Sequence, residues 1–212
     1  MKKKPIYNFF KRLFDFFCST IAIIIFSIPM LIVAIAIKCD SKGPVFFKQN
    51  RIGKNKKIFK IIKFRSMYTT TDPNAPTHQL GNATSHITRV GKFIRKTSID
   101  ELPQLFNIWV GSMSIVGPRP ALWNQDDLIE ERDKYFANNV KPGLTGLAQI
   151  SGRDELEIPV KAKIDGDYVK KRGFFYDILL IIKTVFSVFK SDGVVEGGTG
   201  ELNKQKENEV SE

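Results

Sequence analysis

An apolar run near the N-terminus most constrains how this chain can fold. It reads "FFCSTIAIIIFSIPMLIVAIAI", covers residues 16–37 and contains no charged residue. At about 1.5 Å per helical residue it is long enough to cross a hydrocarbon core of about 30 Å, so it predicts membrane insertion. A buried helix of a soluble domain is an alternative, but such a helix usually keeps a polar face. A cleaved signal peptide is another, although its apolar region is usually only about 7–15 residues long.

Basic residues flank this run on both sides. Lys2, Lys3, Lys4, Lys11 and Arg12 precede it, and Lys38, Lys42, Lys48 and Arg51 follow it. Positive flanks tend to stay in the cytoplasm, so both ends favour the same side of the membrane. Pro29, near the middle, can bend a helix sharply because it lacks a backbone donor. A re-entrant helix would satisfy both flanks, but the residues alone leave re-entrant and spanning forms open.

The positive charge of the chain lies in its N-terminal third. The formal net charge is +11, yet residues 1–68 hold 15 Lys and Arg against two acids, Asp15 and Asp40. The remainder carries 18 basic and 20 acidic residues. The stretch 46–65 mixes basic and aromatic residues, as nucleic-acid binders do. Because it follows the apolar run directly, we interpret it as a basic collar beside a membrane and expect no nucleic-acid partner.

The rest of the sequence predicts a mixed α/β, helix-rich fold. We expect a membrane-embedded segment at 1–40, a catalytic domain at 41–190 and a disordered tail at 191–212, which lacks the apolar content to pack. Residues 45–67 read as a β-hairpin and 69–86 as a long loop. Helices are predicted at 91–96, from near 98 to Gly111, at 126–137 and at 174–190, with a stiff extended element at 116–120 and a short strand at 147–151. The two cysteines, Cys18 and Cys39, form no disulfide framework or metal motif.

Two adjacent carboxylates stand out in "SIDELPQL", residues 98–105. Ser98 and Glu101 have the spacing of a capping box, whereas Pro103 belongs in the first helical turn and moves the helix start closer to Asp100. In either case Asp100 and Glu101 lie at the positive end of a helix, which keeps a carboxylate ionised. Leu102, Leu105, Phe106 and Trp109 follow with the spacing of a buried stripe.

Cations that suit phosphate accompany these acids. Arg119 lies between Pro118 and Pro120, which limit its backbone freedom, and a rigidly presented guanidinium suits bidentate phosphate binding. Arg95, Lys96, Lys63 and Arg65 are further candidates. Two acids that can hold Mg²⁺, together with fixed cations, form a recurring solution to phosphoryl transfer.

Four ordered motifs make the chain resemble the bacterial sugar transferase family, the small monotopic phosphoglycosyl transferases. The motifs are "KFRSM", "RKTSIDELPQLFNIWVGSMSIVGPRP", "KPGLTGLAQISGRDEL" and "KIDGDYV". The resemblance covers about residues 8–190. It implies an enzyme that moves a sugar-1-phosphate from a UDP-sugar to polyprenyl phosphate, such as undecaprenyl phosphate, and releases UMP. Such an enzyme would initiate the assembly of a surface polysaccharide or glycoconjugate.

The resemblance also implies roles for individual residues. Asp100 would be the nucleophile and form a covalent phosphosugar intermediate, and Glu101 would assist it together with Mg²⁺. Arg119 would hold phosphate, and Lys63, Arg65, Arg95, Gln149, Arg153 and Asp165 match positions that line or support family active sites. The N-terminal helix would be re-entrant, with the catalytic domain on the cytoplasmic face of the cell membrane. The family usually has a serine directly before the breaking proline, whereas here Ile28 precedes Pro29 and Ser27 lies one position further back.

The sequence says less about the identity of the sugar and about the oligomeric state. Residues 120–125 ("PALWNQ") and 152–157 ("GRDELE") differ from some relatives at positions that can face the sugar, which favours an N-acetylhexosamine or its 6-deoxy derivative. A homodimer is left open. The main rival is a non-catalytic membrane-surface protein whose basic collar binds anionic lipid and whose two acids only cap a helix.

Overall fold

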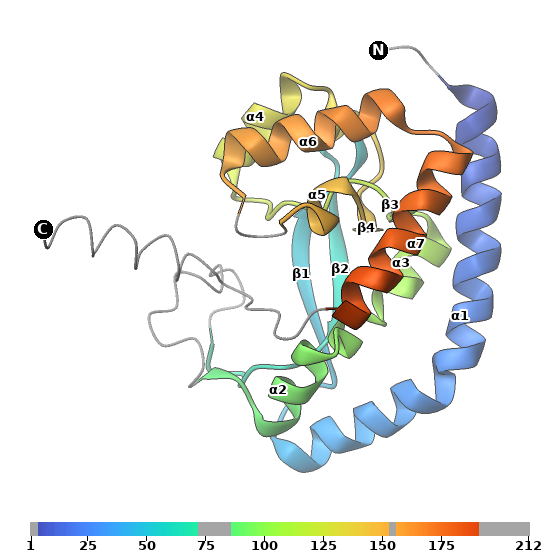
Figure 1. Cartoon of the computed structure of the whole chain (residues 1–212). Helices are drawn as coiled ribbons and strands as arrows, with labels where there is room; N and C mark the ends of the chain where they lie inside the picture. Colours follow the sequence, from blue (N-terminus) through green and yellow to red (C-terminus); the bar gives the residue numbers. More distant parts are fainter. Residues whose placement is uncertain (1–3, 72–85, 153–155, 191–212) are drawn as a thin grey trace, which may run out of the picture.

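The computed structural model describes residues 4–71, 86–152 and 156–190. A long N-terminal helix, α1, runs along one side of a body built from short helices and two small sheets (Figure 1). This confirms a helix-rich mixed α/β fold. The predicted tail at 191–212 and most of the predicted loop at 69–86 lie outside the described residues.

Helix α1 (Pro5–Asp40) contains the apolar run and Pro29. It is long and apolar enough to cross a membrane, and few of its residues are buried against the body. The reading as a core helix of a soluble domain is therefore wrong. The helix curves under the body in its C-terminal half (Figure 1), as expected where a proline removes a backbone hydrogen bond. The Ser27 hydroxyl donates to the carbonyl of Ile24 at 2.7 Å.

The N-terminal half of α1 is tied to the body by buried and half-buried polar contacts. Arg12 donates to the carbonyls of Ile108 and Trp109, the last residues before the end of α3 (Gln104–Val110). The buried Asp15 carboxylate accepts the backbone N–H of Ile115 at 3.0 Å. Cations are favourable at a helix C-terminus, where Arg12 adds hydrogen bonds to the last carbonyls of α3. These contacts fix the N-terminal half of α1 against α3 and β3 (Ser114–Val116).

A second group of contacts joins this half to α7 (Phe174–Lys190). Asp177 accepts hydrogen bonds from Tyr7 at 2.7 Å, from Lys11 at 2.6 Å and from Tyr168 at 3.1 Å. Asp177 is buried, so its charge needs these partners. The sequence predicted a helix at 174–190. The structure confirms the helix, and Asp177 ties it to α1.

The C-terminal half of α1 contacts the same body at a different place. Ile37 is buried with Phe64 and Ile94. The Asp40 carboxylate accepts the N–H of Val90 in the first turn of α2 (Arg89–Lys96) at 3.0 Å. A carboxylate there satisfies a backbone donor that has no partner within α2. Both halves of α1, on either side of Pro29, are therefore held by one domain.

The predicted hairpin is confirmed. Strands β1 (Phe46–Ile52) and β2 (Ile58–Phe64) pair antiparallel, with Phe47 opposite Lys63. The turn includes Asn55 and Lys56 in the left-handed region, which lets a short turn reverse the chain. Because side chains alternate along a strand, Gln49 and Arg51 lie on the same face of the hairpin as Lys63.

A second sheet pairs β3 in parallel with β4 (Gly143–Thr145). The sequence placed a strand at 147–151, which is wrong: these residues begin with the short helix α5 (Leu147–Ile150). Gly117 and Gly143 allow the two segments to approach closely, since a Cβ at Gly117 would lie 2.4 Å from the carbonyl oxygen of Lys141. The predicted extended element at 116–120 is a strand only up to Val116.

Helices α4 (Asp126–Asp133) and α6 (Ile158–Lys171) cover one end of the body (Figure 1). Helix α4 is shorter than the predicted 126–137, because Phe136 adopts φ 57° and a separate turn, η5 (Ala137–Asn139), follows. The sequence analysis did not predict α6. Its buried residues join two apolar clusters, one around Val116 and Leu180 and the other around Ile52 and Leu128.

The predicted buried stripe of α3 is confirmed for Leu102 and Leu105 and is wrong for Phe106 and Trp109. Leu105 and Ile108 are buried, and Leu102 packs beside them. Phe106 and Trp109 are partly exposed. The Trp109 ring stacks on Phe16 of α1 with centroids 5.9 Å apart. The seven-residue helix is too short for one stripe to dominate, and contact with α1 determines which residues are covered.

Candidate active site

The two acids lie in the turn that precedes α3. Asp100 and Glu101 belong to η4 (Ile99–Glu101), and Pro103 forms the N-terminal boundary of α3. Ser98 has φ 56° and makes no side-chain capping bond, so the capping box is wrong. A serine whose backbone is in the left-handed region is uncommon, and this conformation costs free energy. Such backbone strain clusters at functional sites.

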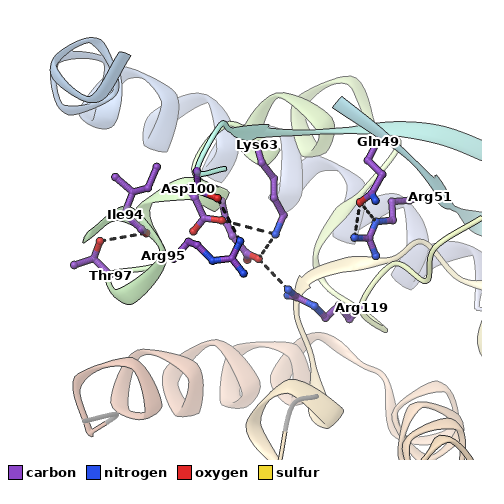
Figure 2. Close-up of polar contacts among 10 residues, drawn as sticks. Gln49, Arg51, Lys63, Ile94, Arg95, Thr97, Asp100 and Arg119 are labelled. Atoms are coloured by element: carbon purple, nitrogen blue, oxygen red, sulfur yellow. Dashed lines mark hydrogen bonds and ion pairs between the residues drawn. The ribbon is translucent and has the colours of Figure 1, made fainter. Parts of the chain in front are cut away.

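Glu101 is held by two cations from different parts of the chain. Lys63, near the end of β2, donates to Glu101 Oε1 at 2.8 Å, and Arg119 donates to the same oxygen at 3.1 Å (Figure 2). Burial alone raises the pKa of Glu101, but the charges of Lys63 and Arg119 more than offset it. The pKa of Glu101 therefore lies well below its ordinary value, and this carboxylate is ionised at neutral pH.

Asp100 occupies a more enclosed position than its neighbour. It is only 4% exposed, and its Oδ2 lies 3.9 Å from Lys63 Nζ. Lys63 thus lies between the two carboxylates, with the closer contact to Glu101. The dyad therefore consists of one acid in two charge-assisted hydrogen bonds and one acid with a longer ion pair to the same lysine (Figure 2).

Arg95 joins this group from α2. Its guanidinium lies beside the dyad in Figure 2, and its NH1 donates to the Ser66 hydroxyl at 3.3 Å. Helix α2, the hairpin and the segment after β3 therefore all contribute cations around one pair of acids. The structure brings together Lys63, Arg95, Asp100, Glu101 and Arg119 among the residues predicted for the site.

Other predicted site residues have different surroundings. The buried Arg65 donates to the carbonyl of Ser41 at 2.7 Å and also contacts that of Lys42, so it holds the chain at the end of α1. Asp165 of α6 pairs with Arg132 of α4. Both Nε and NH2 of Arg132 donate to Asp165 Oδ2, at 2.8 Å and 2.5 Å respectively. Both residues of that pair are buried. Arg153 lies outside the described residues.

Gln149 of α5 shows an unusual feature. Both polar atoms of its side-chain amide are buried and have no hydrogen-bond partner among the described residues. The amide packs against Gly146, where a Cβ would lie 2.7 Å from Gln149 Oε1. Buried amides normally have partners, so this one is suited to accept a ligand or water. Its predicted role in substrate binding stays a prediction.

Two polar residues of the hairpin that lie beside Lys63 and Arg119 were not predicted from the sequence. Figure 2 shows Gln49 and Arg51 beside Lys63 and Arg119. Arg51 donates to Gln49 Oε1 from Nε at 3.1 Å and from NH2 at 2.7 Å, and to the carbonyl of Pro120 at 3.0 Å. The alternation of the hairpin could have identified them, because its register places both on the face of Lys63.

The dyad fits a particular kind of Mg²⁺ site. Among the described residues, no group of three or more His, Cys, Asp or Glu side chains could enclose a metal. Mg²⁺ is commonly held by one or two carboxylates, with substrate phosphates and water as the remaining ligands. Asp100 and Glu101 supply that donor set, although one oxygen of Glu101 is already shared by two cations.

Replacing Lys63 tests the electrostatics of the dyad. With its pKa lowered in the fold, Glu101 stabilises the protein above about pH 4.3, its ordinary value, and that stabilisation is lost as the pH falls. In Lys63→Met the pKa of Glu101 rises, so the loss of stability should be about 1–3 kcal/mol near pH 7 and smaller below pH 4. Denaturant unfolding across this pH range measures it. Lys60→Met, an exposed change in the same strand, is the control. An equal loss at all pH values would contradict this account.

Comparison with known sequences identifies the family of the chain. The profile of the bacterial sugar transferase family matches residues 6–191, so the chain belongs to this family. The chain is 35% identical over 204 residues to the exopolysaccharide production protein ExoY of Rhizobium meliloti, and the match covers 90% of each chain.

Two longer relatives carry names that describe a reaction. The UDP-N-acetylgalactosamine-undecaprenyl-phosphate N-acetylgalactosaminephosphotransferase of Aeromonas hydrophila is 39% identical over 89% of this chain. The UDP-glucose:undecaprenyl-phosphate glucose-1-phosphate transferase of Klebsiella pneumoniae is 41% identical over 85% of this chain. The chain spans 46% and 40% of the lengths of these two relatives.

Proposed function

We propose that this protein transfers a sugar-1-phosphate from a UDP-sugar to polyprenyl phosphate. The observation that carries the proposal is the dyad, in which the buried Asp100 lies beside a glutamate held by Lys63 and Arg119. Phosphoryl transfer depends mainly on positioning and on neutralising charge, and this cluster offers an anionic nucleophile among fixed cations. Membership of the sugar transferase family and the names of its relatives support the same reaction.

The transfer proceeds in two steps. Asp100 attacks the phosphorus that bears the sugar, the bond to the UMP oxygen breaks, and UMP leaves with the bonding electrons. The sugar phosphate is then joined to the Asp100 carboxylate as a mixed anhydride. An oxygen of polyprenyl phosphate attacks the same phosphorus, which releases the carboxylate and yields a polyprenyl diphosphate sugar. A covalent intermediate allows the soluble and the lipid substrate to react in turn.

The surrounding residues have distinct roles in this reaction. Arg119 and Arg95 bind phosphate oxygens, and Glu101 fixes Lys63 and Arg119 around the reacting phosphorus. Bound Mg²⁺ would neutralise phosphate charge beside Asp100 and Glu101. The positive side chains lower the repulsion between a carboxylate nucleophile and an anionic donor.

The contacts of α1 support a re-entrant arrangement. Asp15 and Arg12 hold its N-terminal half to the body, and Ile37 and Asp40 hold its C-terminal half to the same body. A helix that spans a membrane straight would place these halves on opposite sides, where one polar domain could not contact both. Exposed apolar residues lie on both sides of Pro29, including Ile21, Ile25, Leu31 and Ile32. We place the domain on the cytoplasmic face, where the basic flanks favour it.

For the donor we propose a UDP-N-acetylhexosamine or its 6-deoxy derivative, on the basis of residues 120–125 and 152–157. The names of similar relatives include N-acetylgalactosamine, glucose and galactose. These relatives have similar sequence identity to the chain, so the identity alone does not select one sugar.

A donor screen tests the proposed function. The full chain in detergent is given polyprenyl phosphate, Mg²⁺ and single UDP-sugars, and UMP and the lipid-linked sugar are measured. We expect both products in equal amounts with N-acetylated donors. Activity with neutral hexoses alone would overturn the sugar preference. Binding to anionic vesicles without turnover of any donor would favour the non-catalytic membrane protein instead.

A further inference from the structure

The segment that carries Arg119 is fastened to its surroundings on both sides. Before Arg119, the Gly117 N–H donates to the carbonyl of Thr145 at 2.8 Å, and the Pro118 carbonyl accepts the N–H of Gly143 at 2.9 Å. After Arg119, the Ala121 carbonyl accepts from Ile52 at 3.0 Å. The two prolines beside Arg119 have no backbone N–H to donate. The position of Arg119 therefore depends on contacts made by the carbonyls and by neighbouring side chains.

Arg51 supplies such a contact directly next to Arg119. Its NH1 donates to the Pro120 carbonyl at 3.0 Å, and residue 51 also forms a β-bridge with Leu122. Gln49 accepts from the other two nitrogens of the same guanidinium, which orients it as a fork. Gln49 is buried, so its amide is held in place. Because this amide is neutral, it orients Arg51 without adding a third negative charge near the dyad.

This contact joins the two elements that supply the cations of Glu101. Lys63 lies on β2, and Arg51 lies on the same face of the paired strand β1. Arg119 lies on the segment that Arg51 holds, and Figure 2 shows Gln49, Arg51, Arg119 and Lys63 together on one side of Asp100. A displacement of Pro120 would move Arg119 away from Glu101 while Lys63 stayed in place.

We propose that Gln49 and Arg51 form a positioning pair for Arg119: Gln49 orients the Arg51 guanidinium, and Arg51 holds the Pro120 carbonyl so that Arg119 stays directed at Glu101. The pair acts through Arg119 and does not itself contact the reacting atoms. Its kinetic consequence rests on the proposed transferase function, but its structural consequence does not.

A double-mutant cycle tests this pair. Arg51→Met should lower kcat/KM by about 10- to 100-fold in the otherwise native protein, the range expected when a charge-assisted hydrogen bond that orients a phosphate-binding group is lost. In an Arg119→Met background, Arg51→Met should lower kcat/KM by less than about 3-fold, because the guanidinium that Arg51 positions is already missing. Equal losses in both backgrounds would overturn the proposal and indicate that Arg51 acts directly on substrate.

Two further variants guard against misfolding. Gln49→Leu leaves Arg51 in place but removes its orienting acceptor, so it should show the same dependence on Arg119 with a smaller loss. Arg51→Lys should recover only part of the activity, since an ammonium cannot form the fork to Gln49 and reach Pro120 together. Asn50→Ala, an uncharged and exposed position on the opposite face of β1, should have no effect.

Hydrogen exchange provides a readout without turnover. In Arg51→Met the amides of residues 121–125 should exchange faster than in the native protein, while those of β4 remain unchanged. Unchanged exchange at 121–125 would overturn the positioning role whether or not the protein is active. Absence of turnover in the native protein would instead contradict the proposed function, so the two failures are distinct.

Discussion

Asp100→Asn is expected to lower turnover by at least about 10³-fold, because the amide cannot form the covalent bond to the sugar phosphate. Asparagine has nearly the same shape, and Lys63 keeps its hydrogen bond to Glu101, so the fold and the membrane association should persist. When the native protein receives donor without lipid acceptor, mass spectrometry of its peptides should find the added sugar phosphate on Asp100. The Asn variant should show no such adduct.

The control for this result is Asp126→Asn, which makes the same chemical change at an exposed position at the start of α4. It should retain full activity and the adduct. Asp100→Ala repeats the test without an amide that can hydrolyse back to aspartate. A fully active variant at position 100 would remove the basis of the proposed mechanism, as would an adduct found on Glu101.

The contacts of Glu101 support a role different from that proposed for Asp100. Glu101 already accepts two charge-assisted hydrogen bonds on one oxygen, and these lower the basicity of its carboxylate. Asp100 has its Lys63 contact at 3.9 Å, which is beyond hydrogen-bond distance. Glu101 is better suited to arranging the cations.

The parts of the fold that the sequence predicted correctly have local signals. The hairpin at β1 and β2 follows from β-branched and aromatic residues around a turn, and α2 and α7 follow from apolar spacing. The prediction of a strand at 147–151 failed because β4 has only three residues and is selected by pairing with β3, which is distant in sequence. Such a pairing leaves little periodicity to detect.

The residues of the candidate site likewise divide into those with a local sequence signal and those without one. The dyad and Arg119 were predicted because the acids are adjacent and because prolines flank the arginine. Gln49, Arg51 and Arg132 were missed because isolated polar residues in a strand or helix have no distinctive spacing. Only the three-dimensional fold brings Arg51 to Pro120 and Arg132 to Asp165.

The buried pair of Arg132 and Asp165 leads to a second large expected effect, on stability. Arg132 directs two nitrogens at one oxygen of Asp165, and the other carboxylate oxygen is buried without a hydrogen bond among the described residues. Removing one partner leaves the other as an uncompensated buried charge. Arg132→Met or Asp165→Leu alone should therefore lower the free energy of unfolding by about 3–5 kcal/mol, measured by denaturant unfolding in detergent.

The double variant Arg132→Met with Asp165→Leu separates support of the site from contact with substrate. It leaves no unpaired charge between α4 and α6, so its stability should return to within about 1–2 kcal/mol of the native protein. Arg132 and Arg119 line the same small cleft, so the pair also shapes the surroundings of Arg119. If Asp165 only supports the site, the refolded double variant should regain most of the transferase activity. A double variant that is as stable as the native protein but inactive would show that Asp165 or Arg132 acts on substrate directly.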